Sequence, residues 1–317
     1  MGHYHARAVA ARDDAVLAGV FDIDRARAAH VAAEYGAPVV EDLERLAGEI
    51  DGAVIAATTK AHRDLALPLL ARKVSVLIEK PIAATSAEAR EIVAAAEKSG
   101  AVAQAGHILR FDPVSQAVAG RDLAPRYIEV EWAAPFSFRG ADVGVVMDLM
   151  IHGLDLVLHW AGGMPSQVDA VGGIVMGPDE DFANARLAFP NGCVATLTAT
   201  RMSRTRQRVI RLFADGLYLK LDYAARKVEA VTAKPGLAEY AKNRDARTPP
   251  PMEELVAVES VAVDGTRDAL KDQLASFLAA MRGEAPVAVS AREGAQAVEV
   301  AEEVLRAVHA GGMKSNA

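Results

Sequence analysis

Short apolar runs and amphipathic stretches alternate through the first third of the chain. Runs of aliphatic residues are typical of strands that are buried on both faces of a parallel sheet. Such runs lie at 15–21, 38–40, 52–57, 74–78 and 101–106. Stretches with helical periodicity lie at 3–12, 24–35, 42–47, 61–72 and 85–99. Strands that alternate with helices predict an α/β fold built on a doubly wound parallel sheet.

The second part of the chain has a different pattern, in which apolar and polar residues alternate one by one. This alternation is typical of strands with one exposed face. It occurs at 127–132, 167–175, 182–189, 193–199, 207–213 and 216–221. Asn191-Gly192 and Asp215-Gly216 are turn signals between these strands. We therefore expect an α+β domain with a large open, mainly antiparallel sheet, with one face on helices and the other free for a subunit.

The expected domains are residues 1–112 and 113–317. Within the second domain, residues 233–252 are polar and rich in proline, which predicts a long loop. Further along, we expect helices at 266–282 and 291–310, with a short strand at 287–289 between them.

Composition narrows the class of protein. The chain has 317 residues, 51% of them hydrophobic and 24% charged, as in ordinary globular proteins. The net charge of −7 argues against nucleic acid as a partner. Cys193 is the only cysteine, which excludes an internal disulfide and a CxxC metal site. No apolar run is long enough to cross a membrane, and no signal peptide is evident, so we expect a cytoplasmic enzyme.

The run at 74–78 ends abruptly in Glu79, Lys80 and Pro81. The carboxyl end of a strand in an open α/β sheet is where such folds bind ligands. Pro81 ends the strand because it has no N–H for the ladder. One interpretation is that Lys80 exchanges a proton with a substrate. The alternative is that Lys80 caps the strand and points to solvent.

Asp22 follows the run at 15–21 and suggests the cofactor. An acidic residue at this place in a dinucleotide fold accepts hydrogen bonds from the ribose of NAD and repels the additional phosphate of NADP. We therefore expect NAD rather than NADP. The alternative is that Asp22 or Asp24 caps the helix that follows.

A glycine fingerprint is expected in front of the first helix. A dinucleotide-binding sheet opens with an apolar strand followed by G-x-G-x-x-G, whereas this chain begins at Met1-Gly2. Gly2 is interpreted as the third glycine, which lets helix and strand pack closely. We therefore expect Met1 to be an internal methionine and the fold to be N-terminally truncated. An in-frame strand and glycine loop in the upstream DNA would support this, and a stop codon directly upstream would contradict it.

A polar stripe marks the helix expected from Met147 to about Trp160. Asp148, His152, Asp155 and His159 have the spacing i, i+4, i+7 and i+11, which predicts one helix face. Three interpretations are open. The stripe is a metal pair without an evident third ligand, a hydrogen-bonded pair in the core, or a general base, His152, with Asp148 beside it.

Four sequence motifs match those of a known protein family. They lie at 57–62, 79–81, 106–113 and 147–155, in the same order as in that family. The chain resembles the Gfo/Idh/MocA family of NAD(P)-dependent sugar oxidoreductases, which implies a Rossmann-like first domain. The resemblance implies that Lys80 is the active-site lysine and that Asp148 and His152 are the catalytic pair. It places Thr58 and His62 beside the nicotinamide and Glu79 on the cofactor. The family often has proline where Thr59 stands. The full set of expected cofactor residues is Gly2, Asp22, Thr58, Thr59, His62, Glu79, Lys80 and Pro81, and no metal is expected. Expected substrate contacts are His107, Arg110, Asp155 and Arg204.

The motifs at 106–113 and 147–160 are similar to the branch that oxidises nucleotide sugars, UDP-N-acetylglucosamine at C3 among them. Arginines at 201, 204, 206, 208 and 211 give independent support. Arg204, Arg206 and Arg208 would project to one face of a strand and hold a diphosphate. The alternative is a solvated or subunit-facing strand edge.

The implied reaction moves a hydride from a sugar carbinol carbon to the nicotinamide. His152 accepts the hydroxyl proton, Asp148 orients the substrate and the imidazole, and Lys80 donates a hydrogen bond to the same oxygen. Alternatives are a dehydrogenase of free sugars or inositols, and a non-catalytic nucleotide or sugar binder. The exposed sheet face predicts a homo-oligomer, a dimer or tetramer.

Overall fold

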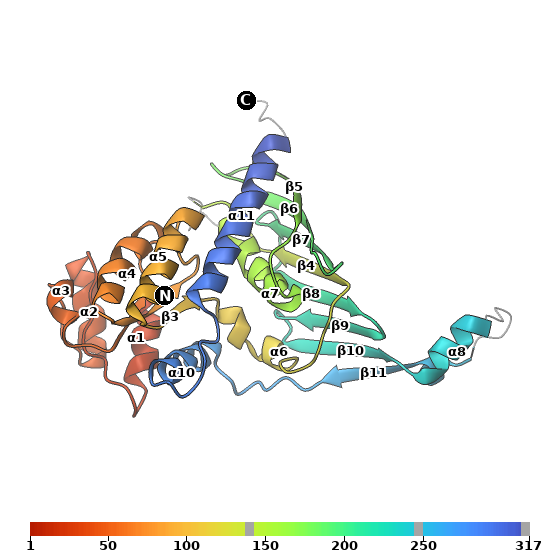
Figure 1. Ribbon diagram of the computed structural model, residues 1–317, viewed down its shortest axis with the longest axis horizontal. Coiled ribbons are helices and arrows are strands. Elements are labelled where there is room, and N and C mark those ends of the chain that lie inside the picture. Colours follow the sequence, from red (N-terminus) through yellow and green to blue (C-terminus); the bar gives the residue numbers. More distant parts are fainter. Residues whose placement is uncertain (137–142, 244–249, 312–317) are drawn as a thin grey trace. The chain divides into compact units, whose positions relative to one another are not determined.

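The computed structural model describes residues 1–136, 143–243 and 250–311, and it divides into two compact units (Figure 1). The first unit contains Met1–Phe111 and Asp268–Glu299. The second contains Asp112–Arg267 and the chain from Val300 onward. The segment Asp268–Glu299 therefore folds with the first unit although it lies far along the sequence.

The first unit is built on a parallel sheet with the strand order β1-β2-β3. The strands are β1 (Gly52–Ile55), β2 (Ser75–Glu79) and β3 (Ala103–Gly106). Every residue of the central strand β2 is buried, which confirms the prediction of a strand covered on both faces. The parallel register aligns the carboxyl ends of the three strands, so the side chains that follow them gather at one edge of the sheet.

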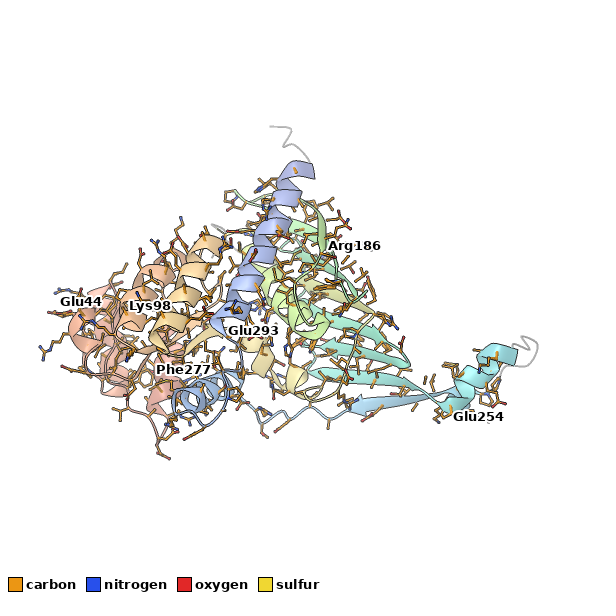
Figure 2. The ribbon with its side chains drawn as sticks, in the orientation of Figure 1. Glu44, Lys98, Arg186, Glu254, Phe277 and Glu293 are labelled. Atoms are coloured by element: carbon orange, nitrogen blue, oxygen red, sulfur yellow. The ribbon has the colours of Figure 1, made fainter. Side chains whose placement is uncertain are left out.

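Helices surround this sheet. They are α1 (Gly2–Ala10), α2 (Arg25–Tyr35), α3 (Leu43–Leu46), α4 (His62–Ala71), α5 (Ser86–Ser99), α10 (Ala269–Met281) and the start of α11 (Ala291–Gly311), with 3₁₀ turns η1 (Thr59–Ala61) and η2 (Ile108–Phe111). Phe277 of α10, which is labelled in Figure 2, belongs to one apolar cluster with Ala8 of α1 and Leu77 of β2. This apolar contact accounts for the assignment of α10 to the first unit.

Three expected strands of the first unit are not formed. Residues 15–21 and 38–40 make only one parallel bridge, between Val20 and Val39, and 287–289 contributes one hydrogen bond from Ala105 N to Val289 O. An apolar run becomes a strand only where a neighbour completes the hydrogen-bond ladder. Within the described residues, no strand flanks β1 on its outer side, and Val16 is 87% exposed.

The second unit is an eight-stranded sheet with the order β11-β10-β9-β8-β4-β7-β6-β5. The strands are β4 (Tyr127–Ala133), β5 (Gln167–Gly173), β6 (Phe182–Ala188), β7 (Val194–Thr200), β8 (Gln207–Ala214), β9 (Leu217–Asp222), β10 (Lys227–Ala233) and β11 (Val256–Val261). Among the strand pairs that the described residues form in this sheet, β4–β7 is parallel and the others are antiparallel. The expected large, mainly antiparallel sheet is confirmed, and the turns at Asn191-Gly192 and Asp215-Gly216 join β6 to β7 and β8 to β9.

The long polar loop expected at 233–252 is partly wrong. Strands β10 and β11 flank it, and it contains the helix α8 (Pro235–Asn243) and the start of the short helix α9 (Met252–Leu255). Its middle, residues 244–249, lies outside the described residues. Buried Val228 and Ala230 do alternate with exposed neighbours in β10, but their small side chains give a weak pattern.

One face of the large sheet is covered by a helical segment that begins as a π-helix, η3 (Val146–Met150), and continues as α7 (Ile151–Ala161) (Figure 1). A Cβ atom on Gly153 would lie 2.8 Å from Val130 Cγ1, so this glycine lets α7 approach β4 closely. The short helix α6 (Pro113–Gln116) also belongs to this unit. Within the described part of the chain, no helix combines the length and apolar character that crossing a membrane requires.

Candidate active site

The carboxyl ends of β2 and β3 meet at Glu79 and Gly106, which are register partners. A Cβ atom on Gly106 would lie 2.7 Å from Glu79 Cα and 2.8 Å from Ile78 O. Glycine is therefore needed for the two strand ends to approach each other. Lys80 and Pro81 follow directly, joined by a cis peptide bond, and the Lys80 side chain is partly buried.

Glu79 is a buried carboxylate with two partners. Its Oε1 lies 2.7 Å from Nε2 of His5, and its Oε2 accepts a hydrogen bond from the backbone N–H of Lys80 at 3.2 Å. A carboxylate only accepts, so Nε2 of His5 carries the proton in this contact. His5 thus ties α1 to the end of β2 beside Lys80. His5 was not predicted from the sequence, because a histidine in an alanine-rich helix has no motif around it.

Replacing His5 with alanine is expected to lower the free energy of unfolding by about 1–3 kcal/mol, because it leaves the buried Glu79 carboxylate without this donor. Urea unfolding monitored by circular dichroism measures the change. His30→Ala is the matched control, since His30 is exposed on α2, and it should stay within about 0.5 kcal/mol of wild type. Equal effects of the two substitutions would contradict a specific contribution from His5.

His62 holds two loops of the first unit together. The imidazole is 1% exposed, with Nδ1 2.9 Å from Pro81 O and Nε2 3.1 Å from Ala57 O. A neutral imidazole has one N–H and donates to one of these carbonyls at a time. His62 therefore joins the loops after β1 and β2. Thr58 is exposed and Thr59 begins η1 at the same edge, and a direct cofactor contact from any of the three stays a prediction.

The helix-capping alternative for Asp22 is wrong. Asp24 is the N-cap of α2, and its side chain accepts hydrogen bonds from the backbone N–H groups of Ala26 and Arg27. Asp22 instead accepts the backbone N–H of Asp24 at 2.9 Å and remains partly exposed. The expected role of Gly2, close packing of α1 against a preceding strand, stays a prediction, and a Cβ atom there would have no close neighbour within 4 Å among the described residues.

Two expected substrate contacts in the first unit are largely buried. His107 is 1% exposed, and Arg110 of η2 pairs with Glu293 of α11 at 3.3 Å. Glu293, labelled in Figure 2, also accepts hydrogen bonds from the backbone and hydroxyl of Ser290. The Arg110 charge is thus already paired within the protein, where it anchors the first turn of α11.

In the second unit, His152, Asp155 and His159 of the expected polar stripe lie on α7, whereas Asp148 lies in the π-helix before it, and a common face for all four stays a prediction. Asp148 is exposed and lies in the π-helix, His152 is partly buried in α7, Asp155 is 2% exposed, and His159 is exposed. A π-helix closes i→i+5 hydrogen bonds, so the i, i+4 alignment of a regular helix does not extend to Asp148. The catalytic pair predicted from the stripe therefore consists of one exposed and one partly buried side chain.

Asp155 belongs to a buried polar group beneath α7. The hydroxyl groups of Ser115 and Tyr223 lie 2.8 Å apart, and the Tyr223 ring contacts Trp132 edge-on. Burial, together with the carboxylates of Asp112 and Asp155, raises the pKa of Tyr223 above its usual range. Tyr223 is therefore a neutral phenol at physiological pH. The burial of Asp155 favours a role in the core of this unit over a direct substrate contact.

A buried acidic pair positions the start of the π-helix. Glu180 Oε1 accepts a hydrogen bond from Val146 N at 3.0 Å, and a Cβ atom on Gly144 would lie 2.0 Å from the same oxygen. Asp181, which is fully buried, accepts three backbone N–H groups of the preceding loop and pairs with Arg201 at 3.5 Å. Neither acid was predicted, since their partners lie far away in the sequence.

The predicted row of arginines is partly wrong. Arg201 is buried against Asp181, and Arg211 pairs with Glu129 at 2.9 Å. Strand β8 begins at Gln207, so Arg204 and Arg206 lie in the loop before it and do not alternate along a strand with Arg208. Serine and threonine at 203 and 205 extend the alternation in sequence, but the ladder to β4 begins only at Gln207.

The metal interpretation of Asp148 and His152 gains no support. Across 1–136, 143–243 and 250–311, no group of three His, Cys, Asp or Glu side chains is arranged to hold a metal ion.

Comparison with known proteins gives consistent matches along the chain. A family model described as an oxidoreductase family with an NAD-binding Rossmann fold matches residues 1–107, and the GFO/IDH/MocA C-terminal domain matches 116–216. The chain is 35% identical to UDP-N-acetylglucosamine 3-dehydrogenase of Acidithiobacillus ferrooxidans, over 98% of this chain and 95% of that protein. It is 25% identical to inositol 2-dehydrogenase of Rhizobium meliloti, over 97% and 94%.

Solved structures agree with these matches. The structure of the Acidithiobacillus ferrooxidans enzyme has a TM-score of 0.87 at 34% identity, covering 97% of this chain and 94% of that one. Levoglucosan dehydrogenase, solved in complex with NADH and levoglucosan, has a TM-score of 0.80 at 17% identity, covering 98% and 95%. The second likeness shows the fold alone.

Proposed function

The chain belongs to the Gfo/Idh/MocA family of oxidoreductases, and on this premise we propose that it oxidises a sugar or nucleotide-sugar hydroxyl with NAD. The family assignment makes the chain an NAD(P)-dependent dehydrogenase that acts on CH–OH groups. The 35% identity to a UDP-N-acetylglucosamine 3-dehydrogenase over 98% of the chain is the observation that carries the substrate proposal.

The proposed roles of the protein groups follow from their chemistry. His152 accepts the proton of the substrate hydroxyl as a general base, and Asp148 orients the imidazole and the substrate. Lys80 donates a hydrogen bond to the oxygen that becomes the carbonyl. The hydrogen bond from Lys80 N to Glu79, and that between Glu79 and His5, support the proposal by fixing the backbone from which Lys80 projects.

The residues of the first unit fit an NAD molecule at the carboxyl edge of the sheet. The carboxylate of Asp22 is not the cap of α2; it accepts the backbone N–H of Asp24 and lies 3.5 Å from Arg27, and in this proposal it also accepts from a ribose. Nδ1 of His5 is buried without a hydrogen-bond partner among the described residues, which suits a site completed by a ligand. Bound NAD would supply the hydride acceptor. Asp22 would disfavour NADP by repelling its additional phosphate.

The test is a substrate panel with purified protein. We expect NADH to form from NAD⁺ with UDP-N-acetylglucosamine, at a higher kcat/KM than with NADP⁺ or with myo-inositol. Formation of NADH with inositols alone would favour the second candidate, an inositol dehydrogenase, which the similarity to inositol 2-dehydrogenase motivates. No turnover together with no NAD binding in calorimetry would favour a non-catalytic member of the family.

The proposal includes a homo-oligomer formed through the open face of the eight-stranded sheet. Glu129, Glu131 and Arg211 form ion pairs on this face, beside the aromatic contacts of Tyr127, Phe213 and Tyr218. Such a mixed polar and aromatic face suits a subunit interface.

A further inference from the structure

We propose that Arg206 and Arg208, together with Arg204 in the same loop before β8 and Arg226 in the turn after β9, form an anion site that binds the diphosphate of a nucleotide-sugar substrate. These four residues are called the arginine cluster below. The inference rests on the proposed function, because it concerns the substrate of the same site, to which Asp148 belongs. Of the two substrate classes considered above, nucleotide sugars and inositols, it selects nucleotide sugars.

Arg208 projects from the face of the sheet that α7 covers. It is the register partner of Trp132 on β4, and directly paired residues point to the same face. Trp132 is buried on that face, where its Nε1 lies close to Gly153 of α7. The carbonyl of Arg208 accepts a hydrogen bond from Tyr223 N at 2.9 Å, which holds the start of β8 against the end of β9.

The charges around Arg208 place the cluster beside the proposed catalytic carboxylate. Arg208 interacts electrostatically with Asp148 and Asp112, which attract it, and with Arg206, which repels it. Arg226, in the turn between β9 and β10, acts on Asp112 as well. The sugar end of a substrate at Asp148 would therefore have its charged end within reach of these guanidinium groups.

The proposed cluster has four guanidinium groups, more than the two carboxylates, Asp112 and Asp148, that act on Arg208. Burial raises the pKa of Asp112. Arg204 and Arg206 are exposed to solvent. Loss of hydration is the larger cause that lowers the pKa of Arg208, and the repulsion from Arg206 is the second. A bound anion would relieve this repulsion.

A diphosphate suits this excess charge. The diphosphate of a nucleotide sugar carries two negative charges at neutral pH, and guanidinium groups bind phosphate oxygens through paired N–H donors. Inositols and free sugars are neutral and offer no partner to the cluster. By contrast, Arg201 forms an ion pair with Asp181, and Arg211 forms one with Glu129. Each of these two positive charges is therefore already balanced by a carboxylate of the protein.

The test measures binding of UDP, and of uridine as an uncharged probe, by isothermal titration calorimetry without cofactor. We expect Arg206→Ala and Arg208→Ala each to weaken UDP binding about tenfold to a hundredfold, the loss of one hydrogen-bonded charge contact, with little change for uridine. Arg186→Ala is the matched control, because Arg186 is an exposed arginine on the opposite face of the same sheet (Figure 2). Its UDP affinity should equal that of wild type.

Two results would overturn the inference: no UDP binding by wild type, or equal UDP affinity in wild type and the Arg206→Ala/Arg208→Ala double variant. Arg206 is exposed, so Arg206→Ala keeps the test valid if substitution of Arg208 disturbs folding. UDP binding is measured without turnover. The calorimetry therefore tests the anion site even if the protein oxidises none of the sugars in the substrate panel. Conversely, consider that the wild type turns over inositol while the double variant binds UDP as tightly as the wild type. That result would reject the anion site, and the protein would still be a dehydrogenase.

Discussion

We expect His152→Ala and Lys80→Ala each to lower kcat by about 10²–10⁴-fold, the contribution of a positioned acid or base. His152→Ala removes the group proposed to accept the hydroxyl proton. Lys80→Ala removes the donor to the oxygen that becomes the carbonyl, at the end of the buried strand β2. Steady-state rates of NADH formation measure the loss. Affinity for NAD, from calorimetry, should change little, because neither role concerns the ribose or the pyrophosphate.

Two substitutions of the same kind serve as controls. His159 lies on α7 with His152 but is exposed, and Lys98 is exposed near the end of α5 (Figure 2). His159→Ala and Lys98→Ala should keep kcat within a factor of a few of wild type. Rates for His152→Ala and Lys80→Ala within that same range would reject both assignments. A loss of NAD affinity that accounts for the whole effect of Lys80→Ala would instead make Lys80 a cofactor-binding residue.

The sequence predicted best the features that depend only on a pattern of neighbouring residues. Strand β2 was predicted because the run at 74–78 is mostly aliphatic and ends in a sudden charge pair, and that pattern depends little on the rest of the chain. The alternation along β4 was equally clear, since it reflects one buried and one exposed face. For the same reason, the edge of the sheet that carries Glu79 and Lys80 was predicted correctly from local order alone.

The features that were missed depend on partners far along the chain. The run at 15–21 has strand character, but Val39 is its only bridge partner in the described structure. The contact between His5 and Glu79 spans 74 residues. Neither has a local pattern, because tertiary packing supplies the partner. The π-helix that carries Asp148 was not predicted either, and it changes the angular spacing between Asp148 and His152 that the sequence argument assumed.

Asp181→Ala is expected to lower the free energy of unfolding by about 3–5 kcal/mol, the usual cost of removing one partner of a buried ion pair. Asp181 is fully buried, and Arg201, 7% exposed, would keep a buried charge without its carboxylate. Three backbone N–H groups, those of Val175, Met176 and Gly177, would lose their acceptor as well. The loss is large against the ~5–15 kcal/mol that stabilises a typical domain. Urea unfolding at neutral pH measures it.

The matched control is Asp179→Ala, two residues away and exposed, which should change the free energy of unfolding by less than about 0.5 kcal/mol.

The pH dependence of stability gives a second test of the role of Asp181. Burial alone would raise the pKa of Asp181, but the three backbone N–H groups and Arg201 outweigh burial and hold that pKa below its usual value. The ionised carboxylate therefore stabilises the fold fully above the unfolded-state pKa of about 3.9, and this contribution is lost as pH falls through the lower folded-state pKa.

The difference in unfolding free energy between wild type and Asp181→Ala should thus be constant near neutrality and shrink in acid. A difference that is small at neutral pH, or that persists unchanged in acid, would contradict the role of the ionised carboxylate.

The same substitution connects stability to catalysis. Arg201 also donates to the carbonyls of Glu180 and Val143, and Glu180 holds Val146 at the start of the π-helix that carries Asp148. If the buried pair positions this helix, kcat falls in Asp181→Ala under conditions where the protein is still folded, whereas Asp179→Ala keeps the wild-type rate.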